Sequence, residues 1–163
     1  YSQCLVFHSL SKRSNLPGLR SGFVAGDASF IAPFLKYRTY HGCSMSMAVQ
    51  KASELAWSDE DHVIVNRDLY AEKFQAAADI LGEQLDSHDP GAGFYLWAKT
   101  PTGCDTFSRD LYAATGVTVL PGQFLGREVD GVNPGAGFVR MALVAEPDTC
   151  REALLRIQRF MTR

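Results

Sequence analysis

The sequence lacks both a charge excess of either sign and any long apolar run. Its 16 basic and 18 acidic residues leave a net charge of −2, which offers no electrostatic basis for binding nucleic acid or an acidic membrane surface. No apolar run approaches the roughly 18 residues that a membrane-spanning helix needs. We therefore expect no nucleic acid and no membrane among the partners of this protein.

Cysteine is scarce and scattered. The four cysteines lie far apart without any C-x-x-C pair, at Cys4, Cys43, Cys104 and Cys150. This spacing argues against a zinc site and against a disulfide framework, so we expect no metal. Isolated thiols of this kind are typical of packed side chains in the reducing cytoplasm, where we expect this protein to reside.

The sequence does contain enough apolar material for a sizeable core. Of its 163 residues, 46% are hydrophobic, a length and composition that ordinarily form one domain. The first residue is Tyr1 rather than methionine, and it leads directly into a strand-like apolar segment. We expect the chain to be a piece of a longer protein.

Strand-like and helix-like segments alternate along the chain. Short apolar runs rich in valine and phenylalanine predict strands at 4–8, 22–25, 94–98, 117–120 and 138–144. Capping residues followed by periodic apolar residues predict helices from Asp27 or Ser29 to about 38, from Ser44 or Ser46 to about 57, and over 59–85, 105–115 and 149–161. Pro33 is expected in or near the first turn of its helix. The alternation predicts an α/β chain with an α+β lobe in its second half.

Lys12 stands out because it follows a short apolar strand and lies within a predicted loop of serines, glycines and a proline. Arg20 comes eight positions later, and Ser9 and Ser11 precede the lysine. A lysine held in such a loop can lose its proton and act as a nucleophile, while hydroxyls and a guanidinium can bind a phosphate. The alternatives are a surface lysine in a turn and an arginine in an ordinary ion pair. The next residue, Arg13, is expected to be solvated.

Arg140 lies inside the predicted strand 138–144, between apolar residues. A charge buried on a strand is costly unless it is paired, which favours a binding role. The alternative is an arginine that faces solvent on an alternating strand. The run Pro121–Phe124 follows another predicted strand and is either a pocket-lining segment or a simple turn. The aromatic residues of 91–97 are expected to lie mostly in the core.

The run around Lys12 resembles the pyridoxal-phosphate signature of fold-type I aminotransferases of class I/II, S-x-S-K followed by G-x-R-x-G. Those positions are Ser9, Ser11, Lys12, Gly18, Arg20 and Gly22. The resemblance implies that Lys12 forms an imine with pyridoxal 5'-phosphate and moves the proton. It also implies that Ser9, Ser11 and Arg20 bind the cofactor, and that Arg140 binds the substrate α-carboxylate. The two glycines are expected to let the loop turn tightly.

The order of these segments matches the C-terminal part of the family's fold, namely the end of the large domain plus the small domain. The resemblance implies three parts: a large-domain remnant over 1–58, a linking helix over 59–85, and a small α+β domain over 86–163. The run 87–91 is expected to stop the linking helix. Amino acids and keto acids are the implied substrates, and a homodimer is the implied assembly of the whole enzyme. Three cofactor contacts expected from an upstream half are absent from this sequence, so we expect this piece alone to be inactive.

Within the family, the runs 9–27 and 121–146 are most similar to N-succinyldiaminopimelate aminotransferases of bacterial lysine biosynthesis. That similarity implies transfer of an amino group from glutamate to N-succinyl-2-amino-6-ketopimelate. Two alternatives stay open. One is a lyase or decarboxylase that uses the same lysine, and the other is an inactive fragment that serves only as a folded structural piece.

Overall fold

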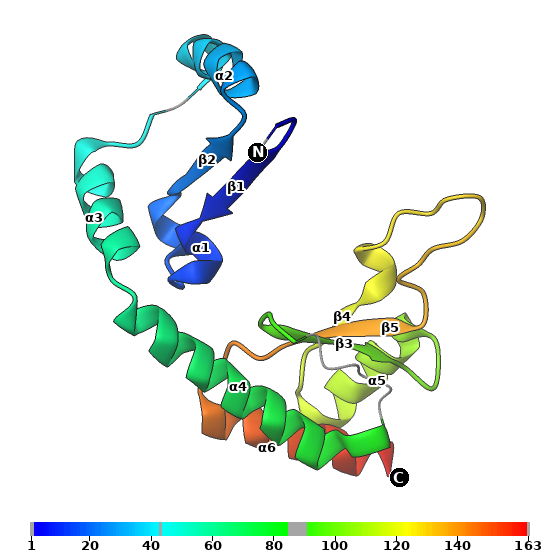
Figure 1. Ribbon diagram of the computed structural model, residues 1–163. Helices are drawn as coiled ribbons and strands as arrows, with labels where there is room; N and C mark the ends of the chain where they lie inside the picture. Colours follow the sequence, from blue (N-terminus) through cyan, green and yellow to red (C-terminus); the bar gives the residue numbers. More distant parts are fainter. Residues whose placement is uncertain (1, 43, 85–90, 163) are drawn as a thin grey trace. The chain divides into compact units, whose positions relative to one another are not determined.

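The computed structural model describes residues 2–42, 44–84 and 91–162, which form two compact units (Figure 1). The first unit is Tyr1–Arg67 and the second is Asp68–Arg163. Cys43 and most of the expected helix end at 87–91 lie outside the described residues. No helix in the described part of the chain combines the length and the apolar character needed to cross a membrane.

The first unit is built on an antiparallel pair of strands, β1 (Leu5–Ser9) and β2 (Gly22–Gly26), as predicted. Their register runs from Leu5 opposite Gly26 to Ser9 opposite Gly22. The connection between them contains the one-turn helix α1 (Leu10–Arg13) and the 3-10 helix η1 (Pro17–Leu19). Two strands cannot bury both of their faces, and Phe7 and Phe23 are accordingly exposed.

Helices α2 (Ala28–His41) and α3 (Met47–Ser58) complete the first unit with the start of α4 (Asp61–Leu81). The side chain of Asp27 accepts a hydrogen bond from the Ser29 N–H, and that of Ser46 accepts one from the Val49 N–H. Both predicted caps are therefore confirmed. Pro33, expected in or near the first turn, lies inside α2 beyond that turn.

The second unit contains a three-stranded antiparallel sheet in the order β3-β5-β4. The strands are β3 (Tyr95–Lys99), β5 (Phe138–Ala142) and β4 (Leu120–Pro121). The predicted strand over 117–120 is wrong in extent. The Val117 N–H is donated to Thr115 Oγ1 at the end of the preceding helix, and Pro121 leads into the 3-10 helix η3 (Gly122–Phe124). Only Leu120 and Pro121 are left to pair with the edge of β5.

The core of this unit lies between the sheet, helices α5 (Cys104–Thr115) and α6 (Pro147–Met161), and the second half of α4. Gly116 ends α5 with φ 71°, and η2 (Gly82–Gln84) follows α4. Large side chains in this core include Leu81, Leu96, Phe107, Leu111, Val139, Met141, Leu154 and Ile157.

The predicted core position of the 91–97 aromatics is wrong for Tyr95 and Trp97. On β3 the buried residues are Leu96 and Ala98, so Tyr95 and Trp97 point to the other face of the sheet. Trp97 stacks there on Phe138, with ring centroids 5.7 Å apart. The division between the two units falls inside α4, and the three-part division at 58 and 85 stays a prediction.

Candidate active site

Lys12 lies in α1 at the closed end of the β1–β2 hairpin, in a helical turn rather than in the predicted loop. Ser9 ends β1, and its Oγ accepts a hydrogen bond from the Ser11 N–H (3.0 Å), which caps the helix. Leu10 is fully buried and its N–H donates to the Ser21 carbonyl (3.1 Å). The cap and the buried leucine together favour one helical turn directly after the strand, and Lys12 stands on its exposed side.

Arg20 comes just before β2 and has a left-handed backbone, with φ 51° and ψ 35°. Its Nη1 donates to the Pro17 carbonyl (3.0 Å), and the rest of the side chain is exposed. The prediction that Gly18 provides the tight turn is wrong, because the left-handed residues of this connection are Asn15 and Arg20. Gly22 is needed for space instead, since a Cβ there would lie 2.6 Å from the His8 carbonyl oxygen.

The hairpin register brings the four predicted cofactor residues to one end of the first unit. Ser9 pairs with Gly22 and Leu10 bonds to Ser21, so Arg20 follows the same closed end from which Lys12 projects. Ser9 and Ser11 are half-buried there, while Lys12 and Arg20 are exposed. Hydroxyls, an ammonium and a guanidinium suit an anionic group beside a reactive carbonyl. This donor set fits a phosphate-bearing aldehyde.

Arg140 occupies the middle of β5 in the second unit, opposite Trp97 of β3 and Leu120 of β4. It is half-buried on the face away from the core, and its guanidinium carbon lies 5.6 Å from the centroid of the Tyr95 ring. Val139 and Met141 are buried on the opposite face, as strand alternation predicts. An arginine supported by an aromatic ring on an open sheet face can bind a carboxylate.

The run Pro121–Phe124 joins β4 to η3, close to the glycine-rich segment that leads back to β5. Asn133 holds these parts together: its Nδ2 donates to the Gln123 carbonyl (3.0 Å), and its Oδ1 accepts from the Gly135 N–H (2.9 Å). Phe124 is 70% exposed. A turn with a fixed backbone and an exposed aromatic side chain is compatible with a pocket lining, and that role stays a prediction.

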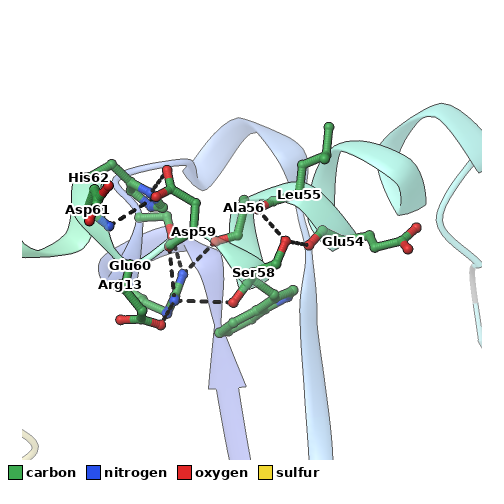
Figure 2. Close-up of polar contacts among 11 residues, drawn as sticks. Arg13, Glu54, Leu55, Ala56, Ser58, Asp59, Glu60, Asp61 and His62 are labelled. Atoms are coloured by element: carbon green, nitrogen blue, oxygen red, sulfur yellow. Dashed lines mark hydrogen bonds and ion pairs between the residues drawn. The ribbon is translucent and has the colours of Figure 1, made fainter.

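Arg13 is the residue that the sequence argument missed. It was expected to be solvated, but its side chain is only 8% exposed and it makes contacts at the junction of α3 and α4 (Figure 2). One signal was available in the sequence: Arg13 follows the apolar Leu10 by three positions, which places both on one face of a helical turn.

In the described residues, no group of three or more His, Cys, Asp or Glu side chains is arranged to hold a metal ion.

Comparison with known proteins assigns this chain to a family. The model of aminotransferase class I and II matches residues 1–157. The chain belongs to this family, whose members use pyridoxal phosphate, and the expected C-terminal part of the fold-type I fold is confirmed.

Particular relatives agree with this assignment. An LL-diaminopimelate aminotransferase of Maridesulfovibrio salexigens is 33% identical over 160 residues, which cover 96% of this chain and 40% of the relative. The crystal structure of an aminotransferase from Neisseria meningitidis is 54% identical with a TM-score of 0.91, covering 96% of this chain and 40% of that one. The aminotransferase AspB of Helicobacter pylori is 36% identical with a TM-score of 0.88, covering 98% and 40%. The chain thus spans about two fifths of the length of these relatives.

Proposed function

We propose that the whole protein is a pyridoxal-phosphate-dependent aminotransferase that takes an amino group from glutamate and delivers it to a keto acid. The observation that carries the proposal is the hairpin register, which places Ser9, Lys12 and Arg20 at one end of the first unit. When bound, pyridoxal phosphate supplies an electron sink for the bonds at the substrate Cα.

Each residue at this end has a distinct task in the proposal. Lys12 Nζ would hold the cofactor through its aldehyde and would move the proton at the substrate Cα. The Arg20 guanidinium would bind the phosphate group, because its planar pair of donors suits phosphate oxygens. The Ser9 and Ser11 hydroxyls donate to the same phosphate. Ser9 Oγ already accepts from the Ser11 N–H, so its own hydrogen is available to donate.

Arg140 is proposed to bind the α-carboxylate that glutamate and keto acids share. A bidentate contact orients the amino acid and so presents its Cα–H for proton transfer. The Tyr95 ring beneath the guanidinium keeps the side chain on the open face of the sheet. The turn Pro121–Phe124 is proposed to line the same pocket.

The proposed acceptor is N-succinyl-2-amino-6-ketopimelate, which places the reaction in diaminopimelate and lysine biosynthesis. The similarity of the runs 9–27 and 121–146 to N-succinyldiaminopimelate aminotransferases supports this choice. A relative named LL-diaminopimelate aminotransferase supports the diaminopimelate skeleton in a more general way. We also propose that the whole protein is a cytoplasmic homodimer, and the buried thiols of Cys104 and Cys150 suit a reducing compartment.

The test is run in reverse with the full-length protein and added cofactor. N-succinyl-LL-diaminopimelate and LL-diaminopimelate are offered separately as amino donors to 2-oxoglutarate, and glutamate formation is measured. We expect the succinylated donor to be preferred and Lys12→Ala to lower turnover about a thousandfold or more. Lys51→Ala is the matched control, because Lys51 is 80% exposed on α3. Substantial transamination by Lys12→Ala, or turnover that needs no keto acid, would refute the proposal.

A further inference from the structure

Helix α1 has a buried side and an exposed side although it is only one turn long. Leu10 and Arg13 are three residues apart and therefore share a face, and both point inward: Leu10 is 0% exposed and the Arg13 side chain 8%. Lys12 is rotated by about 100° from Arg13 and lies on the exposed side. Any rotation of Arg13 about the helix axis therefore rotates Lys12 with it.

The Arg13 guanidinium binds the carbonyl groups at the C-terminal end of α3. Its Nη1 donates to the Ala56 carbonyl (2.7 Å), and its Nη2 donates to the carbonyls of Trp57 (3.4 Å) and Asp59 (3.3 Å). These carbonyls belong to a helix end, where the last groups lack partners within the helix and carry partial negative charge. Arg13 therefore caps α3 with a positive charge, and Figure 2 shows its contacts at this helix end.

The same guanidinium contacts two further groups at this junction. It forms an ion pair with Glu60, which directly precedes α4 and is 63% exposed. Its carbon also lies 4.9 Å from the centroid of the Trp57 ring. Trp57 in turn contacts Phe23 of β2, with ring centroids 5.0 Å apart, and His8 of β1, at 5.3 Å. Arg13 thus connects α1 to the end of α3, to the residue before α4 and, through Trp57, to both strands.

We propose that Arg13 is a positioning residue for Lys12. It fixes the rotation of α1 against the end of α3, and this sets the direction in which Lys12 Nζ points. The inference rests on the proposed function, because it assumes that Nζ must meet a cofactor at a defined place. A lysine at position 13 cannot replace the arginine, since a single ammonium with three donors cannot reach three carbonyls and a carboxylate at once.

The test uses the full-length protein, first prepared without cofactor and then loaded with pyridoxal phosphate, and compares Arg13→Met, Arg13→Lys and Glu60→Gln. Arg109→Met is the matched control, because Arg109 is exposed on α5 and pairs with its neighbour Asp110. Three quantities are measured: kcat per bound cofactor, KM for glutamate, and the rate at which the cofactor becomes attached to Lys12, trapped with borohydride and located by mass spectrometry.

We expect both Arg13 variants to lose about tenfold or more in kcat and in the attachment rate, with KM for glutamate changed by less than about twofold. Glu60→Gln and Arg109→Met should stay within about twofold of the parent, since the helix-end carbonyls keep their partner in both. Hydrogen exchange of the Leu10, Ser14 and Leu16 amides should also quicken in the Arg13 variants, because these amides hold α1 in place.

The outcome that overturns the inference is an Arg13→Lys protein with the parent's kcat and attachment rate, whatever its thermal stability. If Arg13→Met does not fold, Arg13→Lys alone decides. Lys12→Ala separates the two proposals: if it keeps turnover, the proposed function fails, whereas its inactivity beside a fully active Arg13→Lys refutes only the positioning role.

Discussion

Gly122 and Gly135 approach each other so closely that neither position has room for a side chain. A Cβ on Gly135 would lie 2.1 Å from the Gly122 carbonyl oxygen, and a Cβ on Gly122 would lie 2.5 Å from the Gly135 carbonyl oxygen. The contact closes the loop that begins after β4 and returns to β5. Because the obstructing atoms are backbone, no change of side-chain rotamer can relieve a clash there.

We predict that Gly135→Ala lowers the free energy of unfolding of the second unit by about 1–3 kcal/mol, the usual cost of overpacking. This free energy is measured by urea unfolding, with hydrogen exchange of the Val139 and Met141 amides as the probe of the second unit. Gly18→Ala is the control, because no heavy atom lies within 4 Å of its added Cβ, and its effect should stay within about 1 kcal/mol. Equal stability of Gly135→Ala and the parent would mean that the loop can open at no cost.

Arg20→Lys tests the proposed phosphate contact in the full-length protein. The charge is kept but the planar pair of donors is lost, so we expect cofactor affinity to fall by about 1–3 kcal/mol. Equilibrium dialysis of pyridoxal phosphate measures the dissociation constant. Arg109→Lys, an exposed arginine on α5, serves as the control. An unchanged dissociation constant in Arg20→Lys would assign the phosphate to other residues.

Arg140→Met tests the proposed carboxylate contact. Both half-reactions use an α-carboxylate, so KM for glutamate and KM for the keto acid should rise together, by about 10- to 100-fold, while the cofactor dissociation constant stays the same. Steady-state kinetics of both half-reactions measure this. Lys99→Met, at the end of β3, controls for loss of a positive charge on the sheet. A rise confined to one substrate would contradict the proposal.

The start of α4 should be sensitive to acid. The His62 imidazole hydrogen-bonds to the Asp59 carboxylate (2.7 Å) and the Asp61 N–H also donates to it, which lowers the pKa of Asp59 below its usual 3.8. A carboxyl whose pKa is lower in the folded state stabilises the fold at pH values above its pKa in the unfolded state. This contribution is lost as the pH falls through its pKa in the folded state. We therefore expect the amides of 61–65 to be less protected from hydrogen exchange when the pH is below about 4. Asp59→Asn should remove this pH dependence. Asp68→Asn, an exposed aspartate further along α4, should leave it in place.

The starts and ends of helices were predictable because their signals are local. Asp27 and Ser46 carry side-chain acceptors next to the N–H groups that need them, and Gly116 adopts the left-handed backbone that ends α5. The face of β3 was less predictable. One alternating set is Leu96 and Ala98, and the other contains Tyr95 and Trp97 with Lys99 at the strand end. Because large aromatic residues are as typical of a core as Leu96 and Ala98, only the packing of the helices shows which set faces it.

The partners of Arg13 could not be predicted for a different reason, although its spacing from Leu10 indicated its buried face. Its main partners are main-chain carbonyls more than 40 positions away, at Ala56, Trp57 and Asp59. Carbonyl groups are the same in every residue, so no sequence pattern marks the ones that a guanidinium will reach. The grouping of Ser9, Lys12 and Arg20 was predictable because it needs only a short connection between two adjacent strands.

The left-handed backbone conformation of Arg20 lowers the stability of the fold. Residues other than glycine pay roughly 1 kcal/mol or more to adopt a left-handed conformation such as its φ of 51°. Glycine would meet the same demand without that cost, so stability alone favours Arg20→Gly. A directed-evolution experiment that selects for heat resistance without selecting for turnover should therefore discard this arginine early. The same experiment under selection for activity should retain it and recover stability elsewhere in the chain.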